Sequence, residues 1–142
     1  MSDNLTVIQN WFHRVWNKQD VTAIDEMFAA KGMAEGLGGQ ILIGPQDFKI
    51  FHQALCAMVT RIEINIDKSL EDGMWISALC TMRAVSRASG KKIQMTGTVF
   101  CMIDKGKLVQ AFNHWDFMGF FEQIGLLPAD ALAMGLAGKK IR

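Results

Sequence analysis

The 142-residue chain contains no tyrosine, only two prolines and three cysteines, and no long hydrophobic run. Without tyrosine, no phenol group can donate a hydrogen bond to a substrate. No apolar run reaches the roughly 18 residues that a membrane-spanning helix needs, so we expect no membrane partner. The N-terminal segment lacks the basic and continuous apolar regions of a signal peptide, and we therefore predict a cytoplasmic protein.

The three cysteines, Cys56, Cys80 and Cys101, each lie within an apolar segment and form no CxxC pair. This pattern favours buried structural thiols over redox chemistry. The three histidines show no zinc-ligand spacing and there is no glycine-rich phosphate loop, so we predict neither a metal nor an organic cofactor. The formal net charge is +1 and basic residues cluster only at the C-terminus, so nucleic acid is not an expected partner.

Half of the residues are hydrophobic, and the chain is long enough to bury a core as one domain over residues 1–142. Hydrophobic residues at helical spacing predict helices at about 3–18, 21–29 and 45–58. Gly32 is expected to end the second helix, and Pro45 to begin the third. The segment between these helices is rich in glycine and has room for a short strand near Met33–Leu37.

From Thr60 onward the hydrophobic period changes to two, which is typical of strands with one buried face. Turn signals near Gly73, Gly90 and Gly106 divide this region into four antiparallel strands that end at about residue 115. A further helix is expected after Asp116. This order predicts an α+β fold in which a curved antiparallel sheet wraps around the N-terminal helices, a cone-shaped α+β barrel with an apolar pocket.

The segment NHWD, residues Asn113–Asp116, joins the last strand to the following helix. Asp is a favoured N-cap, so Asp116 can stabilise that helix without any further role. Along the strand, two sets alternate: Gln110, Phe112, His114 and Asp116 on one face, and Val109, Ala111, Asn113 and Trp115 on the other. If the first set faces the helices, a carboxylate and an imidazole enter the pocket, and Asp116 and His114 become catalytic candidates.

The other pocket candidates are mostly aromatic, leucine and methionine side chains, which suit an adaptable hydrophobic cavity and equally suit an ordinary core. Glu35, in the glycine-rich segment, is a candidate for the pocket mouth and otherwise a solvated loop residue. The predicted ligand-contacting residues are Phe12, Trp16, Glu35, Phe51, Leu55, Met82, Met102 and Phe112.

The opposite face of the sheet carries Trp75, Leu79, Thr81 and Val109, and it is too apolar to be left exposed to water. We therefore expect a homodimer formed through this outer sheet face, burying on the order of 800 Å² per subunit. A monomer in solution would indicate that the inner and outer faces of the sheet were assigned the wrong way round.

Three segments together resemble the SnoaL-like polyketide cyclases of the nuclear transport factor 2-like superfamily. They are WFHRVWNKQDVTAIDEMFA near the start, GPQDFKIFHQAL in the middle and DKGKLVQAFNHWDFMGFFEQIGLLP near the end. The resemblance covers nearly the whole chain and implies a curved sheet around helices, a deep apolar pocket, dimers, and no metal or organic cofactor. In that family a carboxylate at the strand end is the acid/base for an intramolecular aldol closure, and the matching position is Asp116.

The chain departs from the family pattern in and around the pocket. Family members usually have a tryptophan at the position of Phe112 and an acidic residue at that of Gln110, and strand 93–103 offers no histidine to assist Asp116. The lack of tyrosine excludes a ketosteroid-isomerase mechanism with a tyrosine donor. Three hypotheses remain: proton abstraction alpha to a carbonyl of a hydrophobic substrate by Asp116, non-catalytic binding of a hydrophobic small molecule, and a dimeric interaction module with a vestigial pocket.

Overall fold

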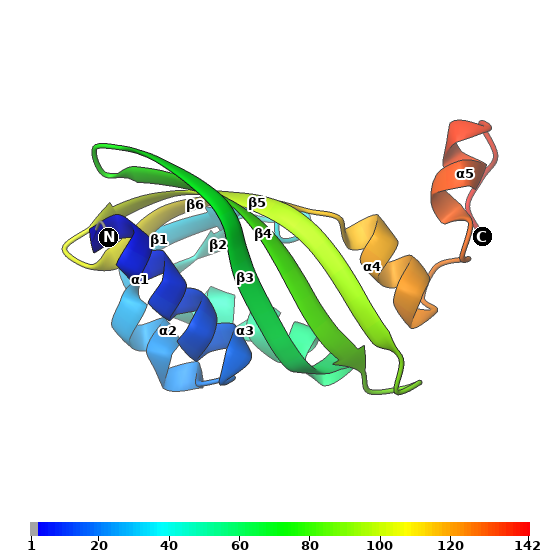
Figure 1. Ribbon diagram of the computed structural model, residues 1–142, viewed down its shortest axis with the longest axis horizontal. Helices are drawn as coiled ribbons and strands as arrows, with labels where there is room; N and C mark the ends of the chain where they lie inside the picture. The colour runs from blue at the N-terminus through cyan, green and yellow to red at the C-terminus, as the bar shows by residue number, and fades with distance from the viewer. Residues whose placement is uncertain (1–2) are drawn as a thin grey trace.

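The computed structural model describes residues 3–142, in which N-terminal helices precede a long curved sheet and two short helices follow it (Figure 1). The helices are α1 (Asp3–Trp11), the π-helix η1 (Phe12–Asn17), α2 (Val21–Met27), α3 (Gly44–Met58), α4 (Phe117–Ile124) and α5 (Ala131–Leu136). The strands are β1 (Phe28–Glu35), β2 (Leu42–Ile43), β3 (Val59–Asp72), β4 (Trp75–Ser86), β5 (Lys92–Asp104) and β6 (Lys107–Trp115). None of the described helices is long and apolar enough to cross a membrane.

The six strands form one sheet in the order β2-β1-β6-β5-β4-β3. Strands β3 to β6 pair with their sequence neighbours in antiparallel fashion, as predicted. Strand β1 adds a parallel pairing with β6, so the sheet is mixed, and it does not close into a complete barrel. Helices α1, α2 and α3 lie on one side of the curved sheet (Figure 1), which confirms the predicted α+β fold with a sheet wrapped around the N-terminal helices.

Strand β1 replaces the end of the predicted helix 21–29, which stops at Met27. Gly32, the predicted helix end, lies inside this strand. A side chain at Gly32 would have its Cβ 2.9 Å from the ring of Phe28 and 3.1 Å from the backbone oxygen of Leu108. Glycine therefore allows β1 to approach β6 closely, where their pairing shifts register between Phe28 and Met33.

The inner face of the sheet follows the predicted alternation on β4, where Ile76, Ala78, Cys80, Met82 and Ala84 are buried. On β6 the alternation is interrupted, because Leu108 pairs with Ile103 whereas Gln110 pairs with Met102. Val109 is thus an extra residue, a β-bulge, and the inward set changes from Leu108 before it to Ala111 and Asn113 after it. The prediction that Phe112 and His114 face the helices is therefore wrong.

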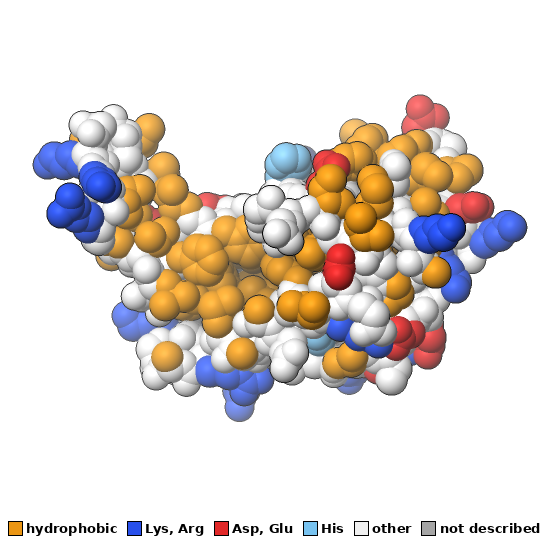
Figure 2. Space-filling model, turned by 180° about the vertical axis from the view of Figure 1, so that it is seen from behind, with side chains coloured by type: hydrophobic (Ala, Val, Ile, Leu, Met, Phe, Trp, Pro, Cys, Tyr) orange, Lys and Arg blue, Asp and Glu red, His pale blue; other side chains and the backbone are white. Residues whose placement is uncertain are grey.

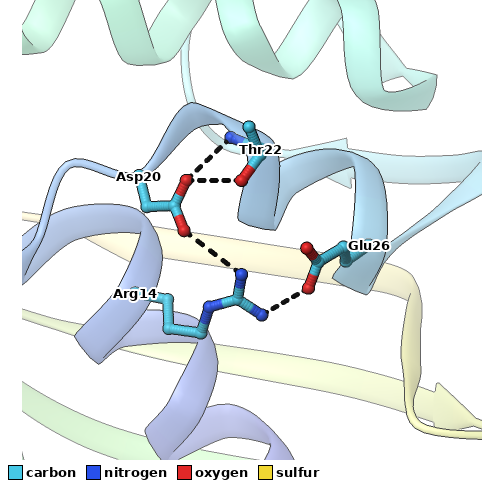
Figure 3. Close-up of polar contacts among 4 residues, drawn as sticks. All are labelled: Arg14, Asp20, Thr22 and Glu26. Carbon is cyan, nitrogen blue, oxygen red and sulfur yellow. Dashed lines mark hydrogen bonds and ion pairs between the residues drawn. The ribbon is translucent and has the colours of Figure 1, made fainter.

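Arg14 connects η1 to α2 through two carboxylates (Figure 3). Its guanidinium donates to Asp20 at 3.2 Å and to Glu26. Asp20 also accepts from the backbone and the hydroxyl of Thr22, at 3.0 and 2.6 Å, and so caps α2. The hydrogen bond from the Thr22 side chain, followed by that from Arg14, lowers the pKa of Asp20, and the bond from Arg14 lowers the pKa of Glu26.

Candidate functional site

An apolar cavity of about 40 Å³ lies between the inner face of the sheet and the N-terminal helices. A space of this size has room for about three water molecules. Nineteen residues line it, and they come from α1, η1, α3, β1, the loop that follows β1, the strands β3 to β6, and α4. Most of them are aromatic or aliphatic, so the cavity is part of the hydrophobic core.

The helical wall of the cavity is built from aromatic side chains in edge-to-face contact. The ring of Trp11 lies 5.0 Å from that of Phe48 at 66°, and the ring of Trp16 lies 6.0 Å from that of Phe51 at 81°. Such pairs are favourable beyond the area that they bury. Nε2 of His52 contacts the backbone oxygen of Val15 at 2.7 Å, and because that oxygen can only accept, His52 donates and joins α3 to η1.

Three half-buried aromatic residues, Phe51, Trp115 and Phe117, lie where α3, β6 and α4 meet around the cavity. Phe51 and Phe117 face each other edge to face across the two helices, with ring centroids 6.4 Å apart. The indole of Trp115 packs directly over Gly97, where a Cβ would lie 2.5 Å from it. On the face shown in Figure 2, hydrophobic side chains gather in a continuous area beside the C-terminal helices.

Five of the eight predicted ligand-contacting residues line the cavity: Phe12, Trp16, Phe51, Leu55 and Met82. Their contact with a ligand stays a prediction. The other three do not line it, and their expected placement is wrong. Phe112 and Met102 lie on the outer face, where the Phe112 ring stacks on Trp75 and Met102 pairs with Trp75. Glu35 pairs with Phe112, so its side chain points toward that same outer face.

Asp116 and His114 are both exposed, and neither lines the cavity. Oδ1 of Asp116 accepts a hydrogen bond from the backbone N–H of Gly119 at 3.0 Å, so the predicted N-cap of α4 is confirmed. His114 pairs with Thr98 on the outer face of the sheet. The expectation that these two side chains enter the cavity is wrong, because the bulge at Val109 reverses the faces of the strand that leads to them.

Asn113 is the polar residue of the cavity wall that the sequence analysis placed on the wrong face. It is 8% exposed and lies on the inner face between Ala111 and Trp115. Its Nδ2 donates to the backbone oxygen of Glu35 at 3.0 Å, and at 3.5 Å to that of Ala111. Asn113 belongs to the NHWD segment. Strict alternation along the strand assigned its side chain to the outer face, because it took no account of the bulge at Val109.

The comparisons with known proteins agree with this architecture. The sequence model of the SnoaL-like domain matches residues 8–111, which is more than half of the chain. The protein belongs to the SnoaL-like domain family. This confirms the resemblance seen in the sequence. Among curated proteins, none matches the chain significantly.

Solved structures with the same fold include a candidate SnoaL-like polyketide cyclase from Jannaschia sp. CCS1. It has a TM-score of 0.76 and 14% identity, over 86% of this chain and 91% of that one. A candidate polyketide cyclase from Acidithiobacillus ferrooxidans has a TM-score of 0.76 and 19% identity, over 88% and 96%. A Catenulispora acidiphila protein with a ketosteroid isomerase-like fold was solved in complex with trimethylamine. It has a TM-score of 0.74 and 16% identity, over 87% of this chain and 95% of that one. At these identities the likeness shows the fold alone.

In this SnoaL-like domain, Cys101 is the one titratable side chain among the described residues that line the cavity. Burial raises the pKa of its thiol to about 12. The thiol is therefore protonated at neutral pH, and a protonated thiol is a poor nucleophile. The cavity wall thus combines a large apolar surface with one fixed amide, that of Asn113.

Proposed function

We propose that this SnoaL-like domain binds a small hydrophobic molecule in the cavity between its helices and the inner face of its sheet. The observation that carries the proposal is the lining, in which eight phenylalanine and tryptophan side chains surround the space. Transfer of apolar ligand surface from water into such a site contributes roughly 25 cal/mol per Å². The assignment to the SnoaL-like family rests on the sequence match. The proposed ligand-binding role rests on the apolar side chains of the cavity wall.

A ligand larger than a few water molecules requires the cavity to widen, because its volume is about 40 Å³. The half-buried residues Phe51, Trp115 and Phe117 are the less enclosed aromatic side chains of the wall, whereas Trp11, Phe12 and Phe48 are buried. Binding then selects conformations in which the contact between Phe51 and Phe117 is open. The trimethylamine complex of the Catenulispora acidiphila protein supports a ligand at the small end of the size range.

The position of Asp116 favours binding over proton abstraction by that carboxylate. A general base must come within about 3.2 Å of the proton that it removes, or reach it through one water. Asp116 is exposed, does not line the cavity and is engaged in capping α4. Cys101, the titratable group in the wall, has a pKa raised by burial and is a poor base at neutral pH.

Titration with toluene, followed by ¹H–¹⁵N correlation spectra and tryptophan fluorescence, tests the binding proposal. Toluene is expected to shift resonances of the cavity-lining residues. Ala111→Leu adds side-chain volume at the cavity wall and is expected to weaken this binding by tenfold or more, on the order of 1.4 kcal/mol. Ala54→Leu, the same change on the exposed side of α3, is the matched control and should leave the affinity unchanged. Unchanged spectra at millimolar toluene would rule the proposal out.

We propose in addition that a second copy of the chain covers the outer face of the sheet. Trp75 stacks on Phe100, with ring centroids 4.9 Å apart and 18° between the planes, and on Phe112 at 6.4 Å. Phe100 and Leu79 are nevertheless 47% and 43% exposed. An exposed aromatic cluster of this kind on the outer face of a sheet is typical of a protein–protein interface.

A further inference from the structure

We infer that the ligand of this cavity carries a hydrogen-bond donor, a hydroxyl or an N–H group, that is recognised by Oδ1 of Asn113. The inference rests on the proposed function, since it names the chemical class of the molecule that the cavity binds. It follows from the orientation of one side-chain amide, from its burial, and from the partners that its two polar atoms have.

The orientation of the Asn113 amide is fixed by its two neighbours. Both contacts of the Nδ2 atom are backbone carbonyl oxygens, of Glu35 at 3.0 Å and of Ala111 at 3.5 Å. Carbonyl oxygens only accept hydrogen bonds, so the nitrogen and not the oxygen of the amide must face them. A flipped amide would set two oxygens against each other, and Oδ1 is therefore held in the opposite direction.

Oδ1 of Asn113 has no hydrogen-bond donor among residues 3–142, in which Nδ2 makes all of the side chain's hydrogen bonds. In the same part of the chain, no side-chain oxygen or nitrogen that is sealed from open space lacks a partner. Oδ1 therefore borders open space, although Asn113 is only 8% exposed. We assign this space to the cavity, because Asn113 lies on the inner face and is one of the residues that line the cavity.

A cavity with this acceptor discriminates between ligands by their polar groups. Burial of a hydroxyl without a hydrogen-bond partner is unfavourable, so a wholly apolar cavity prefers toluene to phenol. With the Asn113 oxygen available, the hydroxyl of phenol can donate to it, and the preference is reversed. Ketones and ethers, which only accept, would set their own lone pairs against Oδ1 and gain nothing from it.

Competitive titration of the full chain with phenol and toluene tests the inference, since the two molecules have the same ring and differ in the hydroxyl and methyl groups. We expect phenol to bind about fivefold more tightly or better, the range of one hydrogen bond, and to shift the Asn113 side-chain amide resonances more than toluene does. Tighter binding of toluene would overturn the inference and leave the proposed function standing. Binding of neither molecule would overturn both.

The variant Asn113→Leu removes the acceptor while keeping a side chain of similar size. It is expected to reverse the preference, so that toluene binds about tenfold more tightly than phenol, as a buried unpaired hydroxyl predicts. Asn65→Leu, on the exposed side of β3, is the matched control and should keep the preference for phenol. Retention of that preference in Asn113→Leu would contradict the inference. If that variant does not fold, the competitive titration of the unsubstituted chain with phenol and toluene decides whether the inference holds.

Discussion

Asp116 and Gly119 form a close pair at the start of α4, in which the carboxylate accepts the Gly119 backbone N–H at 3.0 Å. A Cβ on Gly119 would lie 2.4 Å from Oδ2 of Asp116, so the absence of a side chain there leaves room for the carboxylate. The residue that the family resemblance proposes as an acid/base is thus held by the helix that it caps, on the exposed side of the strand end.

Replacement of Asp116 tests its role as the N-cap of α4. Asp116→Asn is expected to change the free energy of unfolding by less than about 1 kcal/mol, because Asn caps helices about as well as Asp, whereas Asp116→Ala should cost about 1 kcal/mol. Urea unfolding measures both. Asp130→Ala, at the N-cap of α5 where the side chain makes no capping bond, is the control and should cost less. An Asn variant as unstable as the Ala variant would contradict the capping role.

Gly36 is expected to be the least replaceable glycine of the loop that follows β1. Its φ is +86°, and a Cβ there would lie 1.8 Å from the backbone oxygen of Asn113. Gly36→Ala must therefore move the backbone next to the cavity wall and should destabilise the fold by about 2–4 kcal/mol.

Gly39 provides the matched comparison in the same loop, since a Cβ there meets nothing within 4 Å and its φ is not in the left-handed region. Gly39→Ala should change the stability by no more than about 1 kcal/mol, and in the stabilising direction. Thermal or urea unfolding of the two variants gives the comparison. Equal effects would mean that the contact of Gly36 with Asn113 is not what holds the loop.

The proposed dimer predicts that charge on the outer sheet face separates the two copies. Phe100→Lys places an ammonium group in the stacked cluster with Trp75, and burial of an unpaired charge disfavours association. Light scattering after size exclusion at micromolar concentration should then change from the dimer mass to the monomer mass. Ile50→Lys, at a residue of α3 that is 69% exposed, should remain dimeric. A monomeric unsubstituted protein would refute the proposal directly.

The contribution of Arg14 to stability should disappear in acid. Its hydrogen bonds lower the pKa of both Asp20 and Glu26, so folding favours the ionised carboxylates. This contribution is fully present above their unfolded-state pKa of about 4 and is lost as the pH falls through the lower folded-state values.

The melting temperatures of the unsubstituted protein and of Arg14→Met are measured between pH 7 and pH 2, and the difference between the two proteins at each pH reports the contribution of Arg14. It should be largest near neutral pH and should shrink below about pH 4. The side chains involved are partly exposed, so the difference should also fall with added salt. Arg83→Met is the control, as Arg83 forms no ion pair within the described part of the chain. A difference that stays constant with pH would assign the effect to packing.

The sequence predicted the meander β3 to β6 because β3, β4 and β5 alternate over many residues and glycine turns separate the four strands. On β4 the inward residues are uniformly apolar, whereas Ser77 and Arg83 mark the outer face, so the faces could be assigned. Strand β1 was predicted only at its end, near Met33, because it depends on a parallel pairing with the distant strand β6. Strand β2 has two residues and α5 has six, and both escaped this reasoning because they are too short for a period to be recognised.

The placement of residues at the cavity was predicted correctly on the helices and incorrectly on β6. Phe12, Trp16, Phe51 and Leu55 lie in helices, where the hydrophobic spacing was recognised, and they line the cavity. The change from α-helix to π-helix at Phe12 leaves Phe12 and Trp16 buried. On β6 both faces mix apolar and polar residues, so the composition cannot distinguish them. The deciding feature is the bulge at Val109, which is set by pairing with β5 and leaves no local signal.

The bulge at Val109 shifts the alternation of inward and outward side chains on β6 by one residue. Every side chain between it and the end of β6 is assigned to a face by the number of residues before it rather than by its own chemistry. If the same sequence continued from Leu108 without the bulge, Phe112 and His114 would point into the cavity, and Asn113 would join the outer face. The bulge therefore decides whether an amide or an imidazole is offered to a ligand, although both residues stay in the sequence.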